Sequence, residues 1–515
     1  NSKTDMFSCF IERGFSFVKE NGFNCMVTMQ SWMFLTGFNK FRKEIFSQAT
    51  IETLLHMDNM VMGIAFGTCA TVFRKMYMPD YFGNYTPVNY VDLNKNGIPN
   101  TFPVEKNNNS RASINQFNCI EGTPVAYWLS DTAILAFNNK TLGDYAKPRQ
   151  GMATSDNNRF LRYWFEVESQ KICYSATDDR AAEESKCKWF PYNKGGSYRK
   201  WYGNNEYLLN WEHNGFEVKA LATKLYKCVT RTIKNMQFYF KQGITWSTLS
   251  SGNFSARYCG KGFLFDTKGS TCFFDDEEKI KYCIAFLNGK VAMELLKVLA
   301  PTMDFNAGAI ARLPIKYDID RKIDIDQLVQ NCIDISKFDW DSFETSWDFK
   351  RHPLDSYATN TISAAFEMWS KECAERFKQL KTNEEELNHI FIDIYGLQDE
   401  LTPEIEDKDI TVRKADLTRD IKSLISYAVG CMFGRYSLDE DGLAYAGGEW
   451  DNGKYDTFIP DEDNCIPITD EEYFEDDIVG LFCAWLKKVY GENNLEENLD
   501  FIANALGNKG FQADI

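Results

Sequence analysis

The sequence is poor in the residues that build common metal and redox sites. It contains only 4 His, and its 15 Cys never form a C-x-x-C pair. Neither a zinc ribbon nor a thioredoxin-type motif is therefore predicted. The H-E-x-x-H spacing is missing as well, so we predict no catalytic metal. An odd number of cysteines without a pattern is typical of a reducing compartment, and the predicted location is the cytoplasm.

Long apolar runs and basic leader sequences are also missing. No stretch approaches the roughly 20 apolar residues that a membrane span needs, and the first residues lack the features of a signal peptide. With 44% hydrophobic and 15% aromatic residues and only 13 Pro, the composition is that of a folded globular protein. The length of 515 residues predicts about three or four domains. We predict no membrane partner.

Charge is spread unevenly along the chain. The formal net charge of -17 alone disfavours binding to nucleic acid. Residues 140–270, however, carry 21 Lys and Arg against 12 Asp and Glu, a balance of +9, whereas residues 396–515 carry 10 against 28, a balance of -18. The middle of the chain is thus basic enough to bind DNA, and the acidic residues are concentrated in the C-terminal part.

The first 76 residues have the alternating pattern of an α/β sheet. Apolar spacing and β-branched runs predict helix, strand, helix, strand and strand over residues 5–20, 23–35, 38–49, 50–58 and 63–75. The first of these strands is a nearly continuous apolar run, which predicts burial on both faces. This order is the second half of a doubly wound sheet. Neither G-x-G-x-x-G nor G-x-x-x-x-G-K-[ST] occurs, so we expect a piece of a longer protein whose half-sheet has an open edge.

Downstream of this half-sheet, we predict four further segments. Residues 77–116 are polar and rich in Asn, which is typical of a linker with one or two short strands. Residues 117–315 predict a mixed α+β module, residues 316–395 a helical spacer, and residues 396–515 an acidic, mainly helical domain. The predicted fold class is therefore α/β plus α+β, followed by a mainly helical C-terminal region.

Three stretches suit contact with DNA. "GMATSDNNRFLR" (151–162) offers a turn at a glycine, short polar groups and two arginines, which suit phosphate oxygens and base edges. "CKWFPYNKGGSYRKWYG" (187–203) interleaves cations with aromatic rings, which suits phosphates and stacked bases. "GITWSTLSSGNFSARY" (243–258) offers a third loop of Trp, Ser and Arg.

Each stretch also has a purely structural interpretation. The first can be an Asx turn and helix cap at Ser155 and Asp156, the second a hairpin with one packed aromatic face, and the third an ordinary Ser-rich turn. The predicted DNA contacts, drawn from these stretches and from "YAKPRQ" before the first, are Lys147, Arg149, Thr154, Ser155, Asn157, Arg159, Lys194, Ser197, Arg199, Lys200, Trp201, Trp246 and Arg257.

Several of these segments resemble one family. "SKTDMFSCFIERGFSFVKENG", "MVTMQSWMFL" and "AFGTCATVF" are similar to the region downstream of the Asn-Pro-Pro-Tyr motif in gamma-class adenine-N6 DNA methyltransferases. "WFPYNKGGSYRKWYGN" and "LAPTMDFNAGAIARLPI" resemble their target-recognition region. "SYAVGCMFGRYSLDEDGLAYAGG" and "IPDEDNCIPITDEEYFEDDIVG" narrow the resemblance to the PglX family, the adenine-specific methyltransferases of BREX phage-defence systems.

The resemblance implies methyl transfer from S-adenosylmethionine to adenine in double-stranded DNA. The Asn-Pro-Pro-Tyr motif and the cofactor loop would lie upstream of Asn1, so we predict no catalytic or cofactor-binding residue in this chain and expect the piece alone to be inactive. Methylating a base in a duplex requires turning it out of the stack. Phe66 in "GIAFGTC" is the candidate for holding that base, with a core role as the alternative; Trp32 is a weaker candidate.

The implied partners are double-stranded DNA and, through acidic residues 396–515, other BREX proteins. A second interpretation is a DNA site-recognition subunit without catalytic ancestry, although such a subunit has no use for a half-sheet of this kind. A nuclease is not predicted, because we find no carboxylate-lysine cluster that supports one.

Overall fold

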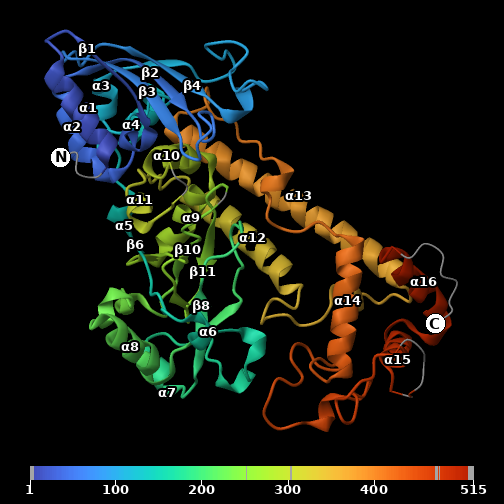
Figure 1. The fold of residues 1–515 in the computed structure, drawn as a ribbon. Coiled ribbons are helices and arrows are strands. Elements are labelled where there is room, and N and C mark those ends of the chain that lie inside the picture. Colours follow the sequence, from blue (N-terminus) through green and yellow to red (C-terminus); the bar gives the residue numbers. More distant parts are fainter. Residues whose placement is uncertain (1–4, 251, 302–303, 470–473, 475, 508–515) are drawn as a thin grey trace.

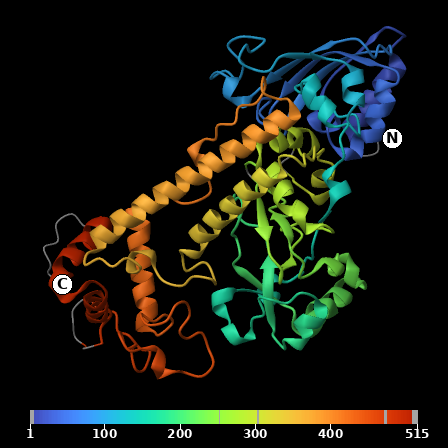
Figure 2. The same cartoon turned by 180° about the vertical axis from the view of Figure 1, so that it is seen from behind.

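The computed structural model describes residues 5–250, 252–301, 304–469, 474 and 476–507. It has three parts, which follow one another along the chain (Figure 1). A five-stranded sheet with its helices lies at one end, two smaller sheets lie beside it, and a group of helices extends from them. The view from behind shows the same arrangement (Figure 2). Among the described residues, no helix has the length and apolar character that crossing a membrane requires.

The first sheet contains three parallel strands. Its spatial order is β1 (Phe23–Met29), β3 (Thr68–Arg74), β2 (Thr50–Met57), β4 (Gly83–Val88) and β5 (Ser110–Ala112). Strand β3 is antiparallel to both β1 and β2, and β2 is parallel to β4. The carboxyl ends of β1, β2 and β4 therefore lie at the same edge of the sheet, where ligands of α/β sheets usually bind.

Helices α1 (Met6–Phe17) and α2 (Asn39–Phe46) cover one face of this sheet. Ile11 and Phe41 belong to the same core as Phe73 of β3. The other face is open in the described part of the chain: Phe23 is 55% exposed and Val27 59%. The predicted burial of the first strand on both faces is thus wrong, because helices pack on one face only and successive side chains alternate between the faces.

The predicted linker contributes to this sheet. One or two short strands were expected in residues 77–116, and two are found, as β4 and β5. Tyr85 of β4 is buried and stacks on Tyr127, with ring centroids 5.0 Å apart. Helix α3 (Ile114–Asn118) follows β5 and packs its Phe117 into the same core. This segment is therefore an integral extension of the sheet.

Residues 131–311 build two four-stranded sheets with helices, as the predicted α+β character requires. One sheet has the order β11 (Ala256–Cys259), β10 (Gly243–Trp246), β13 (Thr271–Phe274) and β6 (Ala146–Arg149); the other has the order β12 (Leu264–Phe265), β8 (Trp189–Asn193), β9 (Tyr207–Asn210) and β7 (Leu161–Tyr163). The helices here are α4 (Asp131–Ala136), α5 (Leu142–Tyr145), α6 (Asn157–Phe160), α7 (Asp179–Glu184), α8 (Glu212–Tyr226), α9 (Ile280–Asn288), α10 (Lys290–Leu299) and α11 (Ala307–Ala311).

The remainder of the chain is mainly helical, as predicted. Its helices are α12 (Lys322–Asp341), α13 (Ile362–Tyr395), α14 (Leu417–Met432), α15 (Ile478–Tyr490) and α16 (Leu495–Ala505). Helix α13 begins at the cap residue Thr361, whose hydroxyl accepts a hydrogen bond from the Ala364 amide, and ends at Gly396, whose φ is 71°. Figure 1 shows it crossing from the five-stranded sheet to the C-terminal helices. The division of the chain into domains stays a prediction.

Candidate nucleic-acid interface

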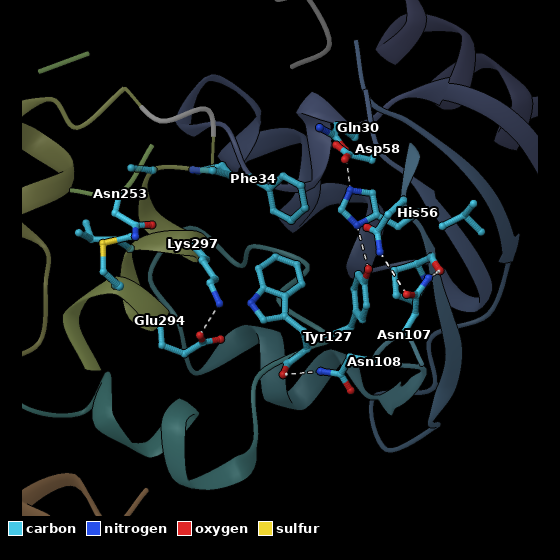
Figure 3. Close-up of a pocket in the computed structure, with 18 of the residues that line it drawn as sticks. Gln30, Phe34, His56, Asp58, Asn107, Asn108, Tyr127, Asn253, Glu294 and Lys297 are labelled. Atoms are coloured by element: carbon cyan, nitrogen blue, oxygen red, sulfur yellow. Dashed lines mark hydrogen bonds and ion pairs between the residues drawn. The ribbon is translucent and has the colours of Figure 1, made fainter. Parts of the chain in front are cut away.

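A pocket opens at the carboxyl edge of the first sheet. Its volume is about 620 Å³, and it lies between this edge and helix α10 (Figure 3). Phe34, His56 and Tyr127 line one side, and Met293 and Lys297 line the other. Residues of both the α/β part and the α+β part of the chain thus line the pocket. We call it the sheet-edge pocket.

His56 is held as a neutral ring in the wall of this pocket. Burial lowers its pKa to about 4, and the nearby Asp58 carboxylate opposes that effect only partly. Nε2 of His56 lies 2.5 Å from Oε1 of Gln30, and Nδ1 lies 2.8 Å from the Tyr127 hydroxyl. Because a carboxamide oxygen only accepts, Nε2 carries the proton and Nδ1 accepts from Tyr127. These bonds fix the orientation of three side chains in the wall.

The rim of the sheet-edge pocket carries amides and cations. The Lys297 ammonium lies 2.5 Å from the Glu294 carboxylate, and Lys106 lies 3.0 Å from Asp92. Both lysine side chains are more than half exposed. Asn253 also lines the pocket, close to Lys297 in Figure 3. The rim therefore offers both charged and neutral hydrogen-bond donors to a ligand.

Phe66 and Trp32 have very different surroundings. Phe66 lies between β2 and β3 and is 60% exposed, so it is not a core residue. Its role in holding a base stays a prediction, and it is not among the residues that line the sheet-edge pocket. Trp32 is fully buried and its ring N–H donates to the Cys69 sulfur at 3.2 Å. Core packing therefore accounts for Trp32.

The stretch 151–162 forms a tight loop and a short helix. A Cβ at position 151 would lie 1.9 Å from the Phe265 carbonyl oxygen, so only glycine fits there. Asp156 caps α6 by accepting a hydrogen bond from the Arg159 amide at 3.1 Å. The interpretation of this stretch as a helix cap is thus confirmed for Asp156. The side chains of Ser155, Asn157 and Arg159 are exposed.

Asn157 connects this loop to the Gly-Gly turn of the second stretch. Its Oδ1 accepts from the Thr154 hydroxyl at 2.6 Å and lies 3.4 Å from Nζ of Lys194. Lys194 is also paired with Asp266 at 2.7 Å. Thr154 itself is buried, so Asn157 and Lys194 are the groups that can face a ligand. Ser197 is exposed on the turn that follows.

Three further predicted cations lie near the same loop. Lys147 pairs with Asp275 at 2.6 Å, and Arg159 pairs with Glu217 at 2.9 Å. The Arg149 guanidinium lies over the Phe238 ring, 5.4 Å from its centroid. Exposed pairs of this kind contribute little to stability. These cations can therefore exchange their partners for phosphate groups at small cost.

A second run of cations, which the sequence reasoning missed, packs against this loop. Residues 224–241 contain five Lys and Arg and no Asp or Glu. The Ala153 amide donates to the Thr232 carbonyl at 2.8 Å, and Lys234 donates to Gln150 at 3.2 Å. The signal available in the sequence was this run of a single charge sign. We call residues 147–159 and 224–241 the basic loops. The cations of the second run are Lys224, Lys227, Arg231, Lys234 and Lys241.

Six predicted DNA contacts are inside the protein, which is a correction to the predicted site. All six side chains are buried, with internal partners; they are Thr154, Arg199, Lys200, Trp201, Trp246 and Arg257. A buried, hydrogen-bonded side chain cannot reach a phosphate or a base without unfolding its surroundings. We therefore assign these residues to the interior and not to the interface.

Arg199 and Lys200 attach the Gly-Gly turn to the long helices. Arg199 pairs with Asp339 of α12 at 2.8 Å, and Lys200 pairs with Glu384 of α13 at 2.7 Å. Glu384 also accepts from the ring N–H of Trp201 at 2.6 Å. The alternation of cations and aromatic rings in this stretch thus serves packing between elements.

The acidic C-terminal part uses several carboxylates to build its own loops. Asp439 accepts hydrogen bonds from the amides of Asp456 and Thr457, both at 2.8 Å. This part also touches the α+β part, since the amide of Ser169, in the short 3-10 helix Ser169–Lys171, donates to the Ala446 carbonyl at 3.0 Å. Within the described ranges, no group of three or more His, Cys, Asp and Glu is placed to hold a metal ion.

Comparisons with known proteins relate the whole chain to DNA-modifying enzymes. A family model described as Eco57I restriction-modification methylase matches residues 1–61. The adenine-specific methyltransferase PglX of Lacticaseibacillus casei (strain Zhang) is 42% identical over 99% of this chain and 43% of its own length. The adenine-specific methyltransferase BrxX of Escherichia coli O9:H4 (strain HS) is 34% identical over 98% of this chain and 42% of its own length.

Solved structures give more distant matches. The type IIL restriction-modification enzyme MmeI in complex with DNA matches 77% of this chain and 50% of its own, with a TM-score of 0.45 and 9% identity. A DrdV–DNA complex matches 69% of this chain and 40% of its own, with a TM-score of 0.33 and 11% identity. The resemblance predicted from the sequence is confirmed by the two curated relatives.

Proposed function

We propose that the whole protein methylates adenine N6 in double-stranded DNA, because the chain belongs to the family of adenine-specific methyltransferases that includes PglX and BrxX. The observation that carries this proposal is the 42% identity to PglX over 99% of the chain. The chain spans about 43% of the length of that relative. It would supply part of the catalytic sheet, the recognition region and the helices that support it, in a phage-defence system of the BREX type.

S-adenosylmethionine would supply the methyl group when it is bound. Its usual site in an α/β sheet is a glycine-rich turn between a strand and a helix. Here β1 is followed by a short 3-10 helix, Gln30–Met33, and β4 by another, Tyr90–Asp92, and neither contains glycine. These residues do not fit the cofactor, so we assign none of them to it and propose that it binds elsewhere in the whole protein.

The residues of this chain would act by holding DNA and the displaced base. Cations of the basic loops would neutralise phosphates, while Asn157 and Arg159 would contact base edges, because amides and guanidinium groups match the hydrogen-bonding edges of purines. The exposed Phe66 ring would stack on the adenine once it leaves the duplex. Each role is supported by exposure of the side chain.

The phosphate contact is tested by the salt dependence of DNA binding. In the full-length protein, Lys227, Arg231 and Lys234 are changed together to Ala. Each lost phosphate contact should lower the slope of log Kobs against log salt by about 0.9, so a decrease of about 2 to 3 is expected. The measurement is fluorescence anisotropy of labelled duplex at several salt concentrations.

A matched control carries the same loss of charge on the long helices. Lys371, Lys378 and Lys422 are exposed on α13 and α14, and changing these three to Ala should leave the slope unchanged. If both triple variants lower the slope equally, the basic loops are not the contact. The alternative of a site-recognition subunit without catalysis is tested separately, by incorporation of labelled methyl groups into DNA by the full-length wild-type protein.

We also propose that acidic residues 396–515 bind other proteins of the same defence system. The support is the segregation of charge: a balance of -18 in this part suits a basic protein surface and repels DNA.

A further inference from the structure

The sheet-edge pocket has the size and walls of a site for a planar ring. Its volume of about 620 Å³ is within the range of small-ligand sites. Phe34, Tyr127 and Trp128 form an aromatic cluster in its wall. The rings of Phe34 and Trp128 are 5.5 Å apart between centroids, and those of Tyr127 and Trp128 are 5.1 Å apart. Aromatic walls of this kind bind nucleobases by stacking, whatever the base.

A hydrogen-bond donor in this wall lacks a partner. The ring N–H of Trp128 is buried and has no hydrogen-bond partner among the residues that the structure describes. Most buried polar groups are paired, because leaving one unpaired costs stability. The neighbouring Tyr127 hydroxyl is already bonded to His56. The unpaired donor therefore points to an acceptor that a ligand would bring, such as a carbonyl or ring nitrogen of a base.

The mouth of the pocket is suited to a phosphate. Lys106 and Lys297 lie there with side chains 67% and 58% exposed, each paired with a single carboxylate. Asn253 at the same rim is exposed, and it adds an amide donor. A phosphate attached to a ring in the pocket can take over these ammonium groups, since exposed ion pairs are weak.

From this combination we propose that the sheet-edge pocket binds a nucleotide, with its base among Phe34, Tyr127 and Trp128 and its phosphate at Lys106 and Lys297. Phe66, the residue assigned to the methylated adenine, does not line the pocket, so this nucleotide is a second one. It is either displaced from the bound DNA, which rests on the proposed function, or free. Both sources present the same chemistry to the pocket.

Photocrosslinking of the full-length protein tests the proposal and separates the two sources. One arm uses duplex DNA in which thymines are replaced by 4-thiothymine, and the other uses free 4-thiothymidine monophosphate. Crosslinked peptides are identified by mass spectrometry. Label on the peptide with Tyr127 and Trp128 in the DNA arm indicates a displaced nucleotide, and label there in the other arm alone indicates a free one.

Two variants sharpen this test. Trp128→Phe keeps an aromatic ring and removes the N–H, so crosslinking at the pocket should fall about fivefold, as expected for the loss of one hydrogen bond. Lys297→Gln should also lower it, whereas the control Lys261→Gln, at an exposed lysine of the β11–β12 loop, should not. Each variant is first checked for the wild-type melting temperature.

Other outcomes overturn the proposal. If DNA labels only the basic loops and neither arm labels the pocket, the pocket proposal fails while the proposed DNA contact stands. Equal labelling of the pocket in wild type and Trp128→Phe also contradicts the assigned hydrogen bond. If the wild-type protein neither methylates DNA nor is labelled by it, the proposed function itself fails. The pocket proposal is then judged separately, by whether free 4-thiothymidine monophosphate labels the peptide with Tyr127 and Trp128.

Discussion

At the scale of single residues, the buried carboxylate of Glu384 has the largest predicted effect on stability. It accepts from both Lys200 and Trp201, at 2.7 and 2.6 Å. Burial is the largest single effect and lowers the pKa of Lys200, but the charge and hydrogen bond of Glu384, together with the charges of Tyr198 and Asp409, raise the pKa above its ordinary value of 10.5. Lys200 therefore stays charged below pH 10.5, and its contribution to stability is lost only as pH rises above that value.

Removing this carboxylate leaves a charged ammonium and an indole N–H buried without a partner. Glu384→Ala should lower the free energy of unfolding by about 3 to 5 kcal/mol. The control Glu386→Ala removes an exposed carboxylate two positions away on the same helix, and it should change stability by less than about 0.5 kcal/mol. Thermal unfolding by circular dichroism measures both. Equal melting temperatures for the two variants would show that the ion pair is not buried.

His56 makes the stability of the first sheet depend on pH. Its pKa is lowered from 6.5 to about 4, with burial as the main cause. Between these two values the unfolded chain binds the proton and the folded protein does not, so stability falls as pH falls, by up to about 1.4 kcal/mol per pH unit.

The His56 prediction is measured as the change of melting temperature between pH 6.5 and 4. His56→Gln should make this change smaller, because Gln does not titrate. His389→Gln serves as the control, since His389 is 59% exposed, and it should leave the pH dependence as in wild type. A wild-type pH dependence in the His56 variant would show that burial does not lower the pKa of this ring in the folded protein.

At this scale, only some of the residues predicted to contact DNA lie where a ligand could reach them. Asn157, Arg159 and Lys194 were chosen for their side-chain chemistry, and they lie at the surface or partly exposed. Arg199 and Lys200 are cations as well, but they are buried against the carboxylates of Asp339 and Glu384. These partners follow 140 and 184 residues later in the sequence. Nothing in the local pattern distinguishes the two groups. The run of cations in 224–241 was visible in the sequence, but its contact with residues 150–153 was not.

At the scale of elements, helix α13 connects two hydrophobic cores. Its N-terminal residues, such as Trp369 and Cys373, pack in the C-terminal core, whereas Leu380 and Phe391 pack in the core of the α+β part. With 34 residues it is about 50 Å long, at 1.5 Å per residue. The two cores should therefore unfold together as long as the helix is continuous.

A proline in this helix should separate the two cores. Lys378 is exposed close to the middle of α13, and Lys378→Pro removes a helical hydrogen bond and adds a steric clash that together cost about 3 kcal/mol or more. Calorimetry of the full-length protein should then show the C-terminal core melting as a separate, lower transition. Lys378→Ala is the matched control and should leave the thermogram unchanged. A single transition in the proline variant would mean that other contacts couple the cores.

Local patterns predicted elements better than their pairing. The expected helices and strands of residues 5–75 all occur, because apolar spacing is a local signal. The two small sheets were not foreseen strand by strand. Their strands have two to five residues, and β6 pairs with β13 although Arg149 and Thr271 are more than a hundred positions apart. Such pairing depends on tertiary packing, which a single sequence pattern does not report.

At the scale of the whole molecule, charge separates a basic part from an acidic part. Residues 140–270 have a balance of +9 and residues 396–515 of -18. Some acidic side chains build loops, but others are exposed and have no such role in the described ranges. Glu440, Glu449 and Glu462 are examples. Because these three are not needed for the fold, their charge is available to a partner protein.

Changing these three residues together to Gln keeps their shape and removes three charges. Recovery of co-expressed BREX proteins with the tagged full-length protein should fall and lose part of its salt dependence, because charge pairs across an interface strengthen at low salt. The matched control changes Glu367, Glu375 and Glu386, which are exposed on α13, and should recover partners as wild type does. DNA methylation should be unchanged in both. If recovery is unchanged and DNA affinity rises instead, the acidic part acts by repelling DNA and not by binding a partner.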